Sequence, residues 1–356
     1  MKSGVILFLI VMMMSCSTAD SFLENEEDTS YNETLDQENK RNNVWIYTQM
    51  LRHYYWNENI PDSTKLDFLI EPGDFFTSLK SKEDRFSWCE ANPNYKKRGI
   101  NIGSTFSFDS VYIINDRKIG YAIYDQFHSN AAVQELAIKM KNTKINDLII
   151  DLRYNPGGYV ATAVDLASYI VPYKYLGRLF QEQRFNSILT REKMEKRRDN
   201  GRDSVYFYST DWYRKWGLNL SQLIILTTTA TASASESLII GLRPYMKVIT
   251  IGTTTCGKDV GSYTIADNNY KYQLQPITFK YYNANNESTP TTGIVPDIYV
   301  EDDLDHQRGD TNEALLKAAI EYLTGEIQIG AVKDRSVSQP KMKEVGRSSI
   351  EIKNNL

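Results

Sequence analysis

The feature that most constrains this chain is a regular alternation of apolar, strand-like runs and helix-like segments between residues 119 and 252. The apolar runs cover Ile119–Ile123, Asp147–Leu152, Leu223–Leu226 and Lys247–Gly252. Segments of helical character separate them, at Ala131–Lys141, Gly158–Ile170 and Ser233–Arg243. Strands that are almost wholly apolar are buried on both faces, as in a parallel sheet covered by helices. The alternation therefore predicts an α/β core.

Composition divides the chain around this core. We expect a targeting segment over residues 1–15, a flexible acidic tether over 16–41, a small helical N-terminal module over 42–92, the core over 93–324 and a polar tail over 325–356. Further expected elements are helices at 42–56, 72–79, 190–200 and 311–323 and strands at 99–103 and 111–114. A charged helix and an aromatic segment interrupt the core at residues 178–217, which we interpret as an insertion.

The N-terminus has the pattern of an export signal. Val5–Met14 is apolar but too short to span a bilayer. It ends at Ser15 and Cys16, a pairing that resembles a bacterial lipoprotein processing site. Lipid on Cys16 would anchor the mature chain in the cell envelope, whereas the alternative is an ordinary secretory signal with an incidental cysteine. The other two cysteines, Cys89 and Cys256, can pair only if the fold brings them together.

Composition also excludes several classes of function. The net charge is −4 and the basic residues form no long run, which argues against a nucleic-acid partner. No spacing of cysteine and histidine indicates a metal site, and no glycine-rich loop indicates a phosphate site. We therefore expect no cofactor. A hydrophobic content of 41% and a charged content of 24% are typical of a globular protein.

The first chemical motif is D-L-R-Y-N-P-G-G at Asp151–Gly158, where a buried strand ends and a helix begins. Gly157 and Gly158 leave their backbone N–H groups open to close approach. At the positive end of a helix, such groups can hold a developing negative oxygen. The alternative is a glycine turn that only starts the helix.

The second motif is T-A-S-A-S-E-S at 231–237, again between a strand and a helix. Ser233 falls at the helix start, where an exposed hydroxyl can attack a substrate. Its small neighbour Ala234 lets substrate approach and can supply a second oxyanion N–H. A cap or core hydroxyl is the alternative for any single serine here.

The third motif is T-T-C-G-K, which ends at Lys258, 25 residues after Ser233. A serine hydroxyl needs a base, and only three histidines exist in the chain. A lysine can be that base if burial lowers its pKa. Lys258 follows an uncharged segment just after a buried strand, which favours a desolvated amine, whereas most lysines lie on surface loops. Of the histidines, His128 is the best alternative base, although a structural role is commoner.

These three motifs, in this order, resemble the C-terminal processing (tail-specific) peptidases of the S41 serine peptidase family. Supporting segments are G-I-V-P-D at 293–297 and D-R-F-S at 84–87, so the resemblance covers residues 42–323. It implies a ClpP/crotonase-like α/β core. It also implies that Ser233 is the nucleophile, that Lys258 is its general base, and that the N-P-G-G glycines and Ala234 form the oxyanion hole.

Two departures from the family pattern stand out. Many members have a glutamine four residues after the lysine to orient it, and here that position is Ser262. Many members also insert a PDZ domain of about 80–100 residues before the core. The chain between Trp88 and Ile119 is too short for a full PDZ domain.

The sequence thus predicts a lipid-anchored serine endopeptidase of the cell envelope that acts on protein or peptide substrates. One rival is a non-catalytic peptide-binding lipoprotein on the same scaffold, favoured by Ser262 and the missing PDZ domain. A second rival is a crotonase-like acyl-CoA enzyme, because that fold shares the oxyanion corners. The combination of Ser233 and Lys258 argues against both, since neither a binder nor an acyl-CoA enzyme needs the pair.

Overall fold

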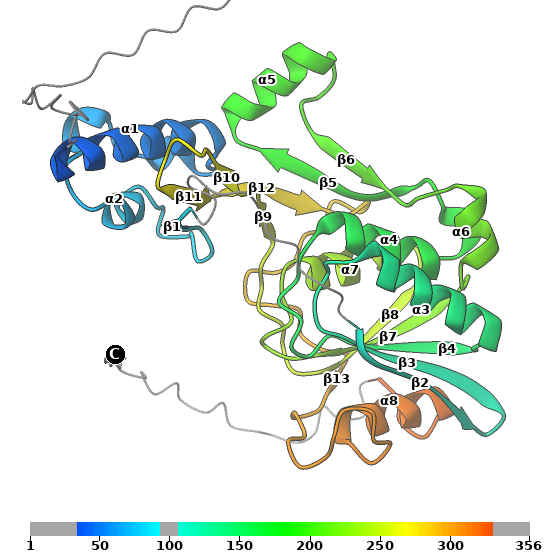
Figure 1. Cartoon of the computed structure of the whole chain (residues 1–356). Coiled ribbons are helices and arrows are strands. Elements are labelled where there is room, and N and C mark those ends of the chain that lie inside the picture. Colours follow the sequence, from blue (N-terminus) through cyan, green and yellow to red (C-terminus); the bar gives the residue numbers. More distant parts are fainter. Residues whose placement is uncertain (1–33, 93–105, 330–356) are drawn as a thin grey trace, which may run out of the picture.

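The computed structural model of the chain describes residues 34–92 and 106–329 (Figure 1). Its centre is a six-stranded sheet with the order β13-β8-β7-β4-β3-β2. The strands are β2 (Phe106–Ile114), β3 (Arg117–Tyr124), β4 (Asp147–Asp151), β7 (Gln222–Thr227), β8 (Lys247–Gly252) and β13 (Ile298–Tyr299). All neighbours are parallel except β2 and β3, which form an antiparallel hairpin. The predicted α/β class is confirmed, with a mixed sheet at its centre.

Helices cover both faces of this sheet (Figure 1). One face packs against α3 (Asn130–Thr143), α4 (Val160–Ile170) and α7 (Ala234–Leu242), and the other against α8 (Ala314–Thr324). Alternate residues of each strand point to opposite faces, so Ile150 and Ile225 join the first core and Ile149 and Ile224 join the second. The continuous apolar runs in the sequence reflect this burial on both sides.

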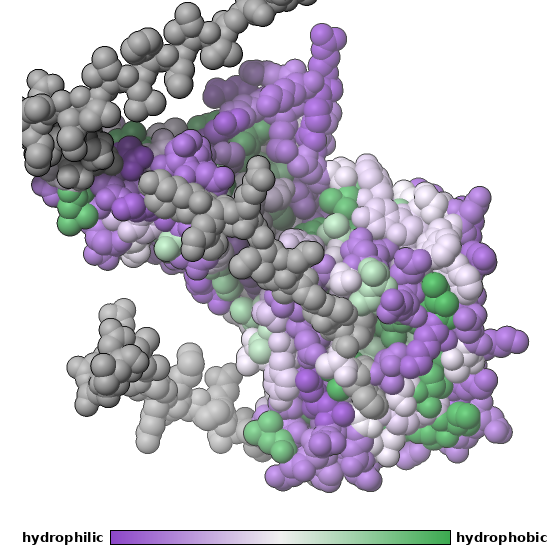
Figure 2. All heavy atoms as spheres, viewed as in Figure 1, coloured by the Kyte–Doolittle hydropathy of each residue, from purple (hydrophilic) through white to green (hydrophobic). Residues whose placement is uncertain are grey.

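A second, antiparallel sheet has the order β6-β5-β12-β9. It combines β5 (Leu179–Phe185) and β6 (Asp203–Tyr206) with β9 (Val260–Ser262) and β12 (Ile277–Tyr282). The segment interpreted as an insertion therefore shares a sheet with strands that follow the lysine motif. Its helix α5 (Ser187–Arg197) projects from the molecule, and Figure 2 shows that this projection is hydrophilic. Its other helix, α6 (Asp211–Trp216), lies against α3 and α4.

The N-terminal module contains α1 (Leu35–His53) and α2 (Pro72–Ser78), as expected, with short 3-10 turns at 57–59 and 63–65. The first helix begins seven residues before the expected start, because Thr34 and Gln37 form a reciprocal capping box. The module continues into β1 (Trp88–Ala91), which pairs with β11 (Tyr272–Gln275). β10 (Ile265–Ala266) pairs with the other edge of β11.

The core of the module is shared with the rest of the protein. Trp45, Met50 and Phe75 are buried together with Val260 and Ile277 from β9 and β12. The helical module is therefore packed directly against the strands that follow Lys258. Strands β9 to β12 were not anticipated from the sequence.

Several sequence predictions concern parts of the chain that the structure does not describe. The export signal, Cys16 and most of the tether lie outside the described residues, as do the expected strand at 99–103 and most of the polar tail. Within residues 34–92 and 106–329, no helix is long and apolar enough to cross a bilayer. Cys89 and Cys256 are both free thiols.

Candidate active site

Ser233 occupies a tight turn between β7 and α7. Its backbone has φ 57° and ψ −114°, a conformation that side chains other than glycine rarely adopt. Holding a residue there costs on the order of 1–3 kcal/mol and requires support from neighbouring groups. The serine is the N-cap residue of α7, so the amide of Ala234 begins the helix. This turn presents Ser233 at the carboxyl edge of the central sheet.

The support comes from Glu236, whose side chain is fully buried in the first turn of α7. Its Oε2 accepts hydrogen bonds from the backbone N–H of Ser233 at 3.0 Å and of Lys258 at 2.8 Å. Its Oε1 accepts from the Thr255 hydroxyl at 2.5 Å and from the Gly257 N–H at 2.7 Å. Four donors thus converge on one carboxylate. It joins the serine turn to the loop that carries the lysine.

The glycine corner after β4 lies directly against the serine turn. A Cβ at Gly157 would be 2.7 Å from the Cβ of Ser233, so only glycine permits this approach. A Cβ at Gly158 would be 2.4 Å from the carbonyl oxygen of Phe127. Both glycines also have positive φ angles, 108° and 138°. The two glycines are therefore required by close packing of three chain segments.

Buried Asn155 connects this corner to the serine turn. Its carbonyl oxygen accepts from the Ala232 N–H at 3.1 Å and from the Ser235 hydroxyl at 3.0 Å. Its side-chain Oδ1 accepts from the Gly157 N–H at 2.9 Å. The Gly157 amide is therefore already occupied, whereas no acceptor among the described residues engages the N–H of Gly158 or Ala234. Of the three predicted oxyanion donors, only the N–H groups of Gly158 and Ala234 are therefore available to a ligand.

Lys258 lies in a half-buried environment that lowers the pKa of its amine. Desolvation by burial is the largest cause, and the charges of Cys256, Glu236 and Asp84 oppose it in part. The aromatic ring of Phe86 lies 5.1 Å from Nζ. A lowered pKa is what a lysine base requires, because only the neutral amine can accept a proton.

The D-R-F-S segment of the N-terminal module holds the lysine loop from outside. Arg85 Nη2 donates to the carbonyl oxygens of Gly257 at 2.7 Å and Thr291 at 3.1 Å. Its guanidinium also stacks over the Phe86 ring at 4.7 Å. This segment was noted in the sequence only as a resemblance. Its contacts with the lysine loop could not be inferred without the fold.

The remaining candidate residues lie close to this centre but have other partners. Ser262 is in β9, and its hydroxyl accepts from Gln275 Nε2 at 2.8 Å, so its lysine-orienting role stays a prediction. His128 lies beside the glycine corner with its ring 5.5 Å from that of Tyr159. The sequence analysis did not predict that Glu236 binds the serine turn and the lysine loop, although this glutamate is part of the T-A-S-A-S-E motif.

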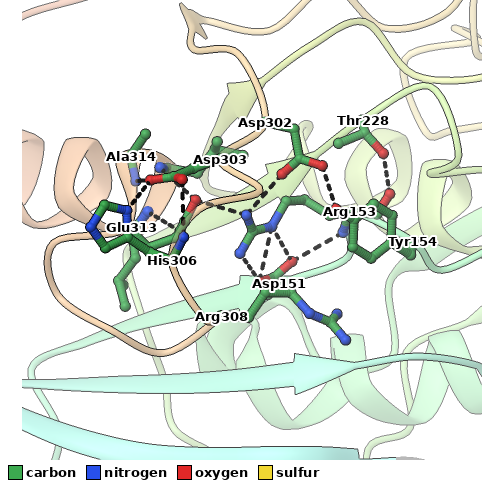
Figure 3. A network of polar contacts seen from close by, with 12 residues as sticks. Asp151, Arg153, Tyr154, Thr228, Asp302, Asp303, His306, Arg308, Glu313 and Ala314 are labelled. Carbon is green, nitrogen blue, oxygen red and sulfur yellow. Dashed lines mark hydrogen bonds and ion pairs between the residues drawn. The ribbon is translucent and has the colours of Figure 1, made fainter.

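A buried ion network fixes the end of β4, from which the glycine corner departs (Figure 3). Arg153 is fully buried, and its guanidinium binds Asp151 at 2.7 Å, Glu313 at 2.8 Å and Asp302 at 3.0 Å. Its carbonyl oxygen accepts from the hydroxyl of Thr228 in the serine turn. Breaking a buried ion pair costs roughly 3–5 kcal/mol, so the network fixes the position of the glycine corner relative to α8.

Comparison with known proteins identifies this arrangement. Residues 118–300, about half of the chain, match the model of peptidase family S41, and residues 41–88 match the peptidase S41 N-terminal domain. The chain belongs to peptidase family S41. The two matched regions contain the serine turn, the glycine corner, the lysine loop and the D-R-F-S segment. The family predicted from the three motifs is confirmed.

Individual S41 relatives are distant. The chain is 27% identical over 52% of its length to a carboxy-terminal-processing protease of Bartonella bacilliformis and 26% identical over 64% to a carboxyl-terminal-processing protease of Synechocystis. It spans less than half the length of each, 39% and 48%. The crystal structure of a candidate S41 protease from Bacteroides fragilis shares the fold, with a TM-score of 0.69. It is 20% identical, and the match covers 80% of this chain and 98% of that one.

Proposed function

We propose that this S41 protein is a serine endopeptidase that hydrolyses peptide bonds with a Ser233–Lys258 pair. The observation that carries the proposal is the buried carboxylate of Glu236, which binds the backbone of both residues. Both amide nitrogens lie within 3.0 Å of one oxygen atom. A protein that only binds peptides has no need to hold a strained serine and a desolvated lysine on one buried carboxylate.

The proposed reaction follows from the groups present. Ser233 Oγ attacks the substrate carbonyl carbon while neutral Lys258 takes the hydroxyl proton. The carbonyl oxygen becomes negative and is held by the N–H groups of Gly158 and Ala234. As the C–N bond breaks, Lys258 returns the proton to the leaving amine. Water, activated by the same amine, then hydrolyses the acyl-enzyme and restores Ser233.

The proposal includes attachment of the protein to the cell envelope through lipid on Cys16. Its support is the short apolar run that ends at Ser15 and Cys16. A lipid anchor would confine the enzyme to substrates at the membrane surface and leave the described residues in water.

An activity-based probe tests the catalytic part of the proposal. A fluorophosphonate should label the wild-type protein at Ser233, and the label should be absent from Ser233→Ala and from Lys258→Ala. Ser221→Ala is a matched control, because this serine is exposed and lies outside the serine turn and the lysine loop. Peptide binding without labelling or cleavage by the wild type would instead favour the non-catalytic binding protein.

A further inference from the structure

A pocket lies between α3, α4 and the aromatic helix α6. Its volume is about 470 Å³, and its lining residues come from α3, α4 and α6. They include Asn130, Gln134, Asp165, Tyr169, Trp212 and Tyr213. An adjoining pocket of about 730 Å³ shares Asn130 and Tyr213 and continues along the segment 204–210. Together they form an aromatic-walled groove, which we call the α6 groove.

The carboxylate of Asp165, which lines the α6 groove, has no positively charged partner among the described residues. Asp165 is only 3% exposed, and its Oδ1 accepts from the Tyr213 hydroxyl at 2.6 Å. Tyr213 is the only hydrogen-bond donor to this carboxylate among the residues the structure describes, and no lysine or arginine there forms an ion pair with it. Its Oδ2 is not among the fully buried atoms that lack a partner, so it is open to the groove. Burial raises the pKa of Asp165 to about 6, and the Tyr213 hydrogen bond opposes this shift. The carboxylate is therefore mainly negative at neutral pH, a state that is unfavourable in a buried position unless a cation approaches it.

The rings around Asp165 suit a cation. The rings of Tyr169 and Tyr213 are 4.7 Å apart, and the indole N–H of Trp212 donates to the Tyr169 hydroxyl at 2.8 Å, which fixes their orientation. Aromatic faces attract ammonium and guanidinium groups within about 6 Å. A buried carboxylate behind aromatic walls therefore favours a positively charged group over a neutral or negative one.

The α6 groove begins next to the oxyanion corner. Phe127 pairs with Gly158, and the chain reaches the groove three residues later at Asn130. The Asn130 side chain is held by the Thr162 hydroxyl at 2.7 Å, in the first turn of α4. Asp165 lies about 7.5 Å further along that helix than Val160, at roughly 1.5 Å per residue. An extended peptide that ran from the oxyanion corner along α4 would advance about 3.3 Å per residue, which would bring a side chain about three residues from the scissile bond to Asp165.

We infer that the α6 groove is a specificity subsite for a basic side chain of the substrate, with Asp165 as the counter-ion of its ammonium or guanidinium group. The inference rests on the proposed peptidase function, because it assigns the groove to the same bound peptide. It also gives a role to residues 206–216, whose aromatic character the catalytic centre does not explain.

Peptide binding to the Ser233→Ala protein tests the subsite without requiring turnover. Fluorescently labelled, otherwise neutral peptides would carry one lysine at each position in turn, and N-acetyl-lysine at the same positions as the uncharged control. Fluorescence polarisation would give each affinity. At one position, lysine should bind on the order of tenfold more tightly than acetyl-lysine. Adding Asp165→Asn should remove this preference and leave the affinity for the acetyl-lysine peptide unchanged.

Equal binding of the lysine and acetyl-lysine peptides at every position would overturn the subsite. A lysine preference that survives Asp165→Asn would also overturn it. If Asp165→Asn does not fold, Trp212→Ala serves instead, since Trp212 is 41% exposed and its truncation should weaken the lysine preference without unfolding the protein. A wild type that cleaves no peptide while the Ser233→Ala protein keeps the lysine preference would refute the proposed peptidase function and retain the groove as a cation site.

Discussion

Replacing Glu236 by glutamine tests whether its carboxylate holds together the proposed catalytic groups, Ser233 and Lys258. The substitution keeps the size and shape of the side chain and changes one oxygen into an NH2 group. Three backbone N–H groups and one hydroxyl donate to the two oxygens of Glu236. In either orientation, the new NH2 group faces at least one backbone N–H. A donor then meets a donor in a buried position.

The cost can be worked out from these contacts. The better orientation turns the NH2 group toward Thr255 and Gly257, because the Thr255 hydroxyl can rotate. The Gly257 N–H is then left without its acceptor, which costs about 1–3 kcal/mol. The bonds from Ser233 and Lys258 lose their charge assistance, roughly 1 kcal/mol each. Removing a buried charge offsets part of this, since burial raises the pKa of Glu236. We expect a net loss of about 3 kcal/mol in the free energy of unfolding.

Activity should fall as well as stability. The backbone of Ser233 is held at a positive φ by its hydrogen bond to Glu236, and a displacement of about 1 Å in a catalytic group can lower the rate about 100-fold. Urea denaturation gives the stability, and initial rates on an unstructured peptide, at a temperature where both proteins are folded, give kcat. Glu195→Gln, on the exposed side of α5, is the matched control and should change neither. A Glu236→Gln protein with wild-type kcat and an unfolding free energy within about 0.5 kcal/mol of wild type would refute this reasoning.

Three further predictions concern the lysine, the groove and the anchor. Lys258→Arg should be inactive, since arginine stays protonated, and wild-type rates should rise with pH through a lysine pKa below the ordinary 10.4, as a pH–rate profile would reveal. Full activity of Lys258→Arg would point to another base, beginning with His128. Asp165→Asn should raise the free energy of unfolding by about 3 kcal/mol at pH 8 and hardly at all below pH 4. The sign follows because the folded-state pKa of Asp165, about 6, exceeds the ordinary 3.8. The stability of the wild-type protein therefore falls as pH rises between those two values. An equal effect of Asp165→Asn at pH 8 and below pH 4 would contradict this reasoning. Mass spectrometry of the mature N-terminus should find lipid on Cys16, and cleavage elsewhere with an unmodified cysteine would count against the anchor.

Elements whose signal is local agree closely with the sequence predictions. The apolar run predicted at Lys247–Gly252 is β8 with those bounds, and the helix predicted at Ser233–Arg243 is α7 with one residue fewer at each end. A buried strand must be apolar throughout and a covering helix must be apolar on one side, so each pattern is visible in a short window. The early start of α1 also had a local signal, the T-x-x-Q capping box at Thr34 and Gln37.

Elements that depend on distant partners were missed. β9, β10 and β11 contain three, two and four residues, too few for an alternating pattern to stand out. The sheets that they join are completed by strands remote in sequence, since β11 also pairs with β1, and β12, the partner of β9, also pairs with β5. Short strands are stabilised by the sheet that they join, and that sheet exists only in the folded chain.

The sequence by itself determined which groups are available for the proposed chemistry: the serine, the lysine and the paired glycines, because each residue type has a specific reactivity or backbone freedom that can be read from its motif. Only the tertiary structure decided how these groups are held. The four donors to Glu236 come from Ser233 and from residues 255–258, and the Arg85 contacts come from a separate module. Burial of Lys258 and Asp165 is likewise a property of the surrounding segments. Hydrogen-bond partners and desolvation depend on residues far apart in the chain, so no local pattern specifies them.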